Sequence, residues 1–100
     1  MSLDGRYFDM DGEPITLMEW AQLYETTGAR HIGSDERDGI HVSTVLLGLN
    51  HNYGDGPPLI FETMIFGGDH DQYQKRYSTK KQAEAGHKRA LALAFGKVPA

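Results

Sequence analysis

The sequence predicts an α+β domain: an antiparallel sheet of three to five strands with two helices packed on one of its faces. Three features lead to this prediction. Apolar segments, alternating or continuous, have the length of strands, two segments of helical periodicity begin at good capping residues, and turn signals separate them. A chain of 100 residues has the usual size of one domain, so residues 1–100 are expected to form a single unit.

The first elements are a short strand and a capped helix. Residues 6–8 are expected to form the strand, and Asp9–Pro14 a turn, because Asp-Gly and proline both interrupt regular structure. Thr16 and Glu19 have the spacing of a capping box. A helix is therefore predicted over 17–26.

A hairpin follows. Residues 30–34 are expected to begin a strand, and the charged segment Asp35–Gly39 to form its turn, because Asp-Gly is a strong hairpin signal between apolar segments. The return strand is predicted over 40–49, which is rich in β-branched residues and leucine. Gly48 within it indicates a bulge or a close approach of another part of the chain.

Residues 59–66 are expected to form a strand that is buried on both faces. Both alternations of its side chains are substantially apolar, which is the pattern of a strand covered from both sides. The loop 50–58 precedes it, and a turn at 67–71 leads to an edge-like strand over 72–77. Strands joined in this way give an antiparallel sheet.

The last element is a helix predicted over 79–95, with Ser78 as its N-cap and Gly96 after its end. Gly86 lies inside this helix at a cost of about 1 kcal/mol relative to alanine. Such a glycine is expected where the helix approaches the sheet closely. The apolar face of the helix consists of Ala83, His87, Ala90, Leu91, Ala94 and Phe95.

The composition excludes several kinds of site. The chain has no cysteine, which excludes disulfides, thiolate zinc sites and cysteine nucleophiles. The patterns of phosphate loops, dinucleotide-binding folds, serine hydrolases and zinc proteases are absent, so no cofactor is expected. No apolar run reaches the roughly 18 residues of a membrane span, and the N-terminus lacks leader-peptide features. We therefore expect a cytoplasmic protein without a membrane partner.

The net charge of −4 is unevenly distributed. Residues 1–40 carry nine acidic and three basic side chains, whereas residues 41–100 carry five acidic and seven basic ones. Such asymmetry can orient a partner, or let acidic and basic faces of two copies meet. Solvated faces without a partner are the alternative interpretation.

Three residues are candidates for enzyme chemistry. His51 lies in a loop with Asn, Asp and Tyr, Glu62 is the charged residue of an apolar strand, and His70 lies between two aspartates. Together they define an alternative function as a small metal-dependent or acid/base hydrolase. The structural alternatives are turns at the two histidines and, for Glu62, an ion pair or a place at the sheet margin, with His87 or Arg30 as possible partners. His87 itself is interpreted as a hydrogen-bonded core histidine.

Basic residues before and on the last helix are candidates for binding a partner, namely Lys75, Arg76, Lys81, Lys88 and Arg89. Phosphates or an acidic protein surface would suit them. The negative net charge and the few accompanying exposed aromatics disfavour nucleic acid, which stays as a further alternative.

Several motifs resemble those of a family of small uncharacterised proteins encoded by actinobacterial bacteriophages and by relatives in host genomes. These motifs, which span most of the chain, are Tyr7–Asp9, Pro14–Thr16 with Glu19–Trp20, Val42–Val45 with Gly48–Leu49, Gly56–Met64, Arg76–Thr79 and Ala85–His87. The chain departs from the family at Leu46, where an aromatic is common, and at Lys80 and Lys81, where acidic residues are common. The family has no assigned functional residues, so the resemblance implies a setting, the host cytoplasm, and no activity.

The sequence thus favours a non-enzymatic bacteriophage accessory protein. It is expected to bind a host or phage protein, or to self-assemble as an oligomer through the sheet face that the helices leave uncovered. The hydrolase and the nucleic-acid binder remain the alternatives.

Overall fold

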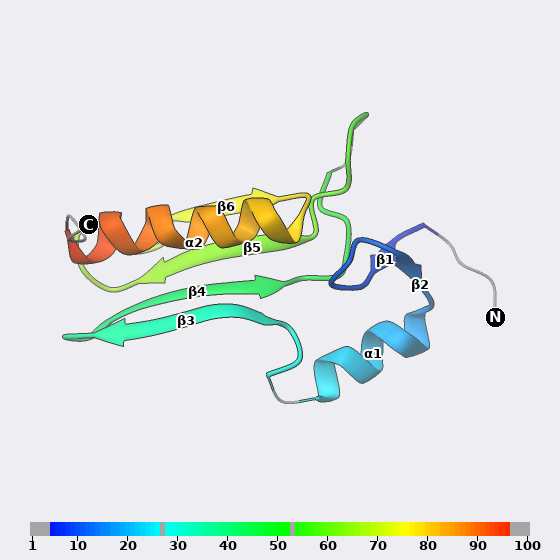
Figure 1. Cartoon of the computed structure of the whole chain (residues 1–100), viewed down its shortest axis with the longest axis horizontal. Helices are drawn as coiled ribbons and strands as arrows, with labels where there is room; N and C mark the ends of the chain where they lie inside the picture. The colour runs from blue at the N-terminus through cyan, green and yellow to red at the C-terminus, as the bar shows by residue number, and fades with distance from the viewer. Residues whose placement is uncertain (1–4, 27, 53, 97–100) are drawn as a thin grey trace.

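A computed structural model describes residues 5–26, 28–52 and 54–96. Its main feature is a four-stranded antiparallel sheet in the order β3-β4-β5-β6, with helix α2 packed along one face (Figure 1). A two-stranded sheet and helix α1 lie beyond one end of this sheet (Figure 1). The predicted α+β class with an antiparallel sheet is confirmed. The elements in the described residues are β1 (Tyr7–Phe8), β2 (Pro14–Ile15), α1 (Leu17–Glu25), β3 (His31–Arg37), β4 (Ile40–Leu46), β5 (Phe61–Phe66), β6 (Gln74–Tyr77) and α2 (Lys80–Phe95).

Helix α1 begins where the sequence predicts but lies elsewhere. The Thr16 hydroxyl accepts from the Glu19 N–H and the Glu19 carboxylate accepts from the Thr16 N–H, which completes the capping box. The contacts of α1 are with β1, so α2 alone covers the sheet face on which both helices were expected. The reason is local: Trp20 and Tyr24 both donate to the carbonyl of Leu47, just past the end of β4.

The hairpin of β3 and β4 has a shorter turn than the sequence predicts. β3 continues through Asp35 and Glu36 to Arg37, and only Asp38 and Gly39 form the turn. Their φ angles of 52° and 80° are both positive, as a type I′ turn requires. The charged residues pair as a strand because β3 lies at the sheet edge, where their side chains stay in water.

Strand β5 is buried on one face, which corrects the prediction of burial on both. Phe61, Thr63 and Ile65 are fully buried beneath α2, whereas Phe66 on the opposite face is 44% exposed. The physical reason is that the chain supplies one helix layer, and α2 occupies one side of the sheet. No described element packs over the other side to an extent comparable with α2.

Helix α2 begins one residue later than the sequence predicts, because Thr79 and not Ser78 is the N-cap. The Thr79 hydroxyl accepts from the Gln82 N–H, and the Gln82 side-chain oxygen accepts from the N–H groups of Ser78 and Thr79. Gln82 decides between the two hydroxyl residues, since a capping box needs its partner three residues after the cap.

Two glycines allow the close contacts that the sequence predicts for them. A Cβ on Gly86 would lie 2.0 Å from Tyr77 Oη, which shows how closely α2 passes over β6. A Cβ on Gly48 would lie 2.6 Å from the Trp20 ring, and φ is +73° there. The core beneath α2 forms two clusters of buried residues, Phe8, Leu46, Ile60, Phe61, Tyr77 and Ala83 in one and Val42, Ile65 and Ala90 in the other.

Candidate functional site

A chain of hydrogen-bonded side chains crosses the sheet beneath α2. Thr44 Oγ1 on β4 lies 2.6 Å from Thr63 Oγ1 on β5 and 2.6 Å from His87 Nδ1 on α2. His87 Nε2 lies 2.7 Å from Asp35 Oδ2 on β3, and it is the donor if the carboxylate is ionised, since that group then only accepts. Gly33 makes room for the ring, because a Cβ there would lie 2.6 Å from Nε2. The network thus ties α2 to three strands.

The order of carboxylate, imidazole and hydroxyl in this network is that of a histidine-activated nucleophile. Such chemistry requires that a substrate reach the hydroxyl and the imidazole, and the burial of both groups prevents this. Thr44 is 0% exposed and His87 is 8% exposed, and none of the hollows described below is lined by either residue. The network therefore holds the fold together, and the interpretation of His87 as a hydrogen-bonded core histidine is confirmed.

Sequence reasoning did not single out the partners of His87. A signal was present for Thr44 and Thr63, which occupy inward positions of largely apolar strands, where a buried hydroxyl needs a partner. Asp35 gave no such signal, because the sequence placed it in the hairpin turn. Only the extension of β3 brings its carboxylate beneath α2.

Glu62 is held on the face of the sheet opposite α2. Its Oε2 lies 3.0 Å from Arg76 Nε on the neighbouring strand and also accepts from the Gln74 side chain. The structure thus selects the ion-pair interpretation, with a partner that the sequence did not suggest. Arg30, one of the suggested partners, donates instead to the Leu46 carbonyl and lies 3.7 Å above the Tyr24 ring.

The two histidines of the hydrolase alternative lie in separate loops. His51 is half-buried in the segment before β5, where its N–H donates to the Leu59 carbonyl, and His70 is exposed in the turn between β5 and β6. Among the residues that the structure describes, no three His, Asp or Glu side chains converge as a metal site would require. The geometry therefore offers the metal-dependent alternative no support.

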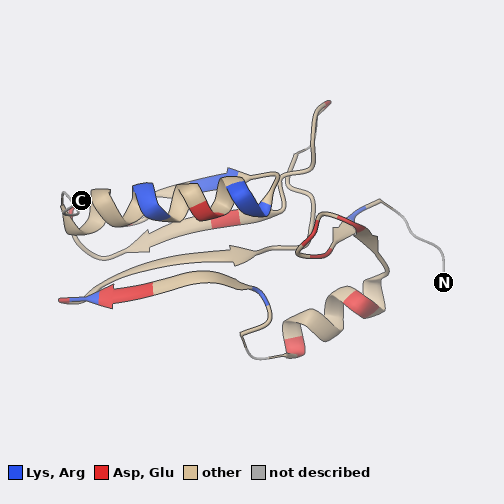
Figure 2. Ribbon diagram, in the orientation of Figure 1, with Lys and Arg blue, Asp and Glu red and all other residues tan. Residues whose placement is uncertain are grey.

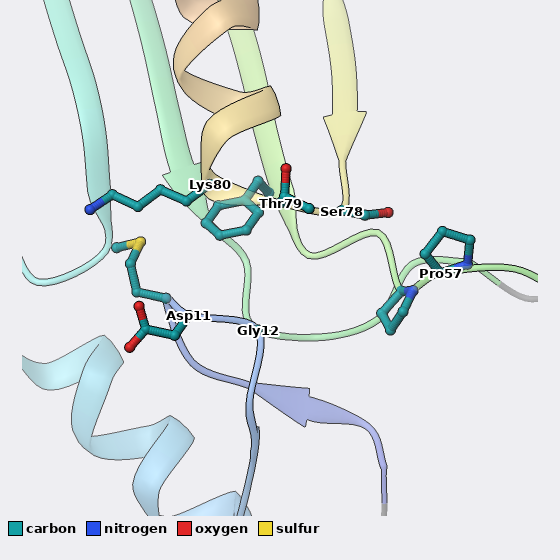
Figure 3. Close-up of a pocket in the computed structure, with 9 residues that line it drawn as sticks. Asp11, Gly12, Pro57, Ser78, Thr79 and Lys80 are labelled. Atoms are coloured by element: carbon teal, nitrogen blue, oxygen red, sulfur yellow. The ribbon is translucent and has the colours of Figure 1, made fainter.

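One hollow lies at the start of α2 (Figure 3). Its volume is about 410 Å³, and Asp11 of the β1–β2 turn faces Thr79 and Lys80 across it. A helix N-terminus with a lysine suggests an anion, but the capping box already occupies the Ser78, Thr79 and Gln82 N–H groups. We assign no ligand to this hollow.

The predicted basic residues divide into two groups. Lys75, Arg76 and Arg89 line one groove of about 330 Å³ between β6 and α2, together with Tyr77, Gln82 and Ala85. Lys81 and Lys88 lie on α2 outside this groove. Figure 2 shows basic residues on β6 and α2 and mainly acidic residues at the C-terminal end of β3, so a part of the charge asymmetry of the sequence lies between the two sheet edges.

Two properties make the groove a candidate binding site. Neither Lys75 nor Arg89 takes part in an ion pair formed within the described residues, whereas Arg76 is paired with Glu62. A second hollow, of about 340 Å³, lies beside the same strand and is lined by Leu59, Gln74, Lys75 and Arg76. Space and positive charge thus adjoin β6 at the open edge of the sheet.

Comparison of the chain with protein-family models, curated proteins and solved structures gave no match. The resemblance to bacteriophage proteins therefore stays a prediction. No helix in the described part of the chain has both the length and the apolar character that crossing a bilayer demands.

Proposed function

We propose that the protein is a non-enzymatic binding module that takes an acidic, extended segment of a protein along the β6 edge. The observation that carries this proposal is the groove between β6 and α2. There Lys75 and Arg89 have no acidic partner among the described residues, and they lie beside the edge of β6 that no strand pairs with in the described sheet. Such an edge offers backbone groups for strand addition, and flanking side chains then select the sequence of the added segment.

The chemistry of the groove favours a protein over nucleic acid. A nucleic-acid channel combines many cations with exposed aromatic rings on which bases stack. Here the groove has two cations, Lys75 and Arg89, that form no ion pair within the described part of the chain, and its aromatic residue, Tyr77, is buried. With a net charge of −4, the protein as a whole also repels a phosphate backbone.

The lack of solvent access at the buried network disfavours an enzyme. The one ordered set of carboxylate, imidazole and hydroxyl groups found among the described residues is closed to solvent at Thr44. On the resemblance alone, we place the module in the cytoplasm of a phage-infected bacterium, with a host or phage protein, or another copy of this chain, as its partner.

The test uses a fluorescent ten-residue peptide of alternating glutamate and threonine. We expect it to bind, and the double variant Lys75→Glu/Arg89→Glu to weaken binding by more than about tenfold, or about 1.4 kcal/mol. The matched control is Lys81→Glu/Lys88→Glu, which changes the net charge equally but lies outside the groove. This control should bind nearly as well as the parent.

Two further probes distinguish strand addition from electrostatic attraction alone. A peptide of alternating glutamate and proline has the same charge but lacks half of the N–H groups, and we expect it to bind poorly. A labelled single-stranded ten-nucleotide DNA should bind more weakly than the first peptide. Equal loss in both double variants, or tighter binding of the DNA, would overturn the proposal.

A further inference from the structure

We infer that the segment taken along β6 is strand β3 of a second copy of this chain, an inference that rests on the proposed function and names its partner. β3 and β6 are the two edges of the same sheet. β3 carries Asp35, Glu36 and Arg37, a net charge of −1, and β6 carries Lys75 and Arg76, a net charge of +2. The edges are therefore oppositely charged, and they lie on opposite sides of one molecule (Figure 2).

The backbone of each edge has groups free to pair. Ile65 N–H donates to the Tyr73 carbonyl, so by the alternation of an antiparallel ladder Gln74 and Arg76 direct their N–H and C=O groups away from β5. The two-residue turn after Arg37 likewise directs the backbone groups of Ser34 and Glu36 away from β4. Both edges can thus accept a strand.

One register satisfies backbone pairing, side-chain faces and charge together. With Ser34 opposite Arg76 and Glu36 opposite Gln74, the outward backbone groups of both strands meet. These four residues belong to the uncovered sheet face of their own copies, because each neighbours the Glu62 or His41 row on that face. Diagonal neighbours on this face are Glu36 and Arg76, an opposite-charge pair.

On the other face, the same register places Asp35 directly opposite Lys75. Both side chains lie on the α2 side of the sheet, Asp35 against His87 and Lys75 in the groove with Arg89. Asp35 uses Oδ2 for His87, and no described residue bonds its Oδ1. The Asp35 side chain is 47% exposed, so this oxygen is available to Lys75 of the neighbouring copy.

Pairing of like edges is opposed by charge. Two β6 edges in the same backbone alternation set Lys75 against Lys75 or Arg76 against Arg76. Two β3 edges with Ser34 opposite Glu36 set Asp35 against Asp35. The register of β3 with β6 instead sets Asp35 against Lys75 and places no like charges directly opposite, so it is the combination that we propose.

The resulting assembly is open-ended. β3 and β6 run in opposite directions within the four-stranded meander, so a second copy in the same orientation continues the antiparallel alternation, with its α2 on the same face. Such head-to-tail contacts form rings or filaments. A pairing of about four residues per strand is a small contact, so association that depends on concentration is expected.

The experiment compares the parent chain with Glu36→Pro by sedimentation velocity over a range of concentrations. Proline removes the outward N–H of residue 36, a position at a sheet edge where proline is tolerated, and leaves β6 unchanged. We expect oligomers of increasing size from the parent and a monomer from Glu36→Pro. The variant should keep its circular dichroism spectrum and its affinity for the glutamate–threonine peptide.

Disulfide trapping tests the register, since the chain has no cysteine of its own. A copy with Glu36→Cys mixed with a copy with Gln74→Cys should form a reducible dimer, because paired residues have Cα atoms about 5.5 Å apart. Ser34→Cys mixed with Gln74→Cys is the control, because these two positions are two residues out of the proposed register. Oxidation of either of the first two copies alone should give little dimer.

The outcomes separate the two proposals. A parent that stays monomeric while the peptide binds in the groove overturns the inference and leaves the proposed function standing. Oligomers that persist in Glu36→Pro, or trapping that favours the out-of-register pair, overturn the inference as well. Absence of both self-association and peptide binding would reject the two together.

Discussion

The buried network under α2 allows a quantitative prediction for Thr44→Val. Valine has nearly the shape of threonine but no hydroxyl, so the substitution removes the group that joins Thr63 to His87. Thr63 is 0% exposed and His87 is 8% exposed, so neither polar group regains water. Each buried polar group left without its partner costs about 1–3 kcal/mol.

The added methyl group of valine recovers about 1 kcal/mol through its burial. The net expectation is a loss of about 3 kcal/mol in the free energy of unfolding, measured by urea denaturation followed by circular dichroism. For a domain of this size the melting temperature should fall by more than about 10 °C. The slope of the urea transition should stay that of the parent, because the surface exposed on unfolding is nearly unchanged.

The control is Ser43→Ala, on the same strand but facing away from α2. The Ser43 side chain makes no hydrogen bond within the described residues, so its loss should change stability by less than about 0.5 kcal/mol. The double variant Thr44→Val/Thr63→Val also removes the Thr63 hydroxyl, one of the two polar groups that Thr44→Val leaves without a partner. Its loss of stability should therefore be smaller than the sum of the losses in the two single variants. If Thr44→Val were as mild as Ser43→Ala, the network would not stabilise the fold as we argue.

Three further outcomes are expected. Tyr77→Phe should leave stability unchanged or raise it by about 1 kcal/mol in urea denaturation, because the Tyr77 hydroxyl is buried and has no hydrogen-bond partner within the described residues. Burial raises the pKa of Tyr77 above its ordinary value of 10.0. The unfolded chain therefore loses this proton first, the stability of the parent should fall as the pH rises above about 10, and Tyr77→Phe should lose that part of the decline. Gly86→Ala should destabilise the protein by at least about 2 kcal/mol despite its better helix propensity, since the new Cβ meets the buried Tyr77 ring, and a gain in melting temperature would contradict this close approach. Gly48→Ala should lower the melting temperature through its φ of +73° and its contact with the Trp20 ring, and an unchanged value would show that neither constraint is rigid.

Local rules read from the sequence located most elements of this chain. Neighbours close in sequence determine the capping box at Thr16 and the Asp-Gly turn at residue 39. The close approach at Gly86 depends on the absence of a side chain at that position. One error arose where two local signals competed. Ser78 and Thr79 are both good caps, and the position of Gln82 selected the second.

The candidate site was predictable in part. The sequence named five basic residues, but the placement of β6 along α2 decided that three of them share a groove. It named Glu62 but not its partner, because Arg76 comes to lie beside it only through the pairing of β5 with β6. Ion pairs and grooves of this kind depend on contacts between residues distant in sequence, which periodicity does not record.

The sequence by itself determined the two helices, the strands of the main sheet in outline, and the excess of acid before residue 41 and of base after it. Tertiary structure decided which edge each charge occupies, which face of β5 stays open, and that His87 joins Asp35 through a buried network with Thr44. The physical reason is the distance along the chain over which each kind of interaction acts. Caps, turns and periodicity act over a few residues, whereas sheet order and helix placement minimise the exposed apolar surface of the whole chain.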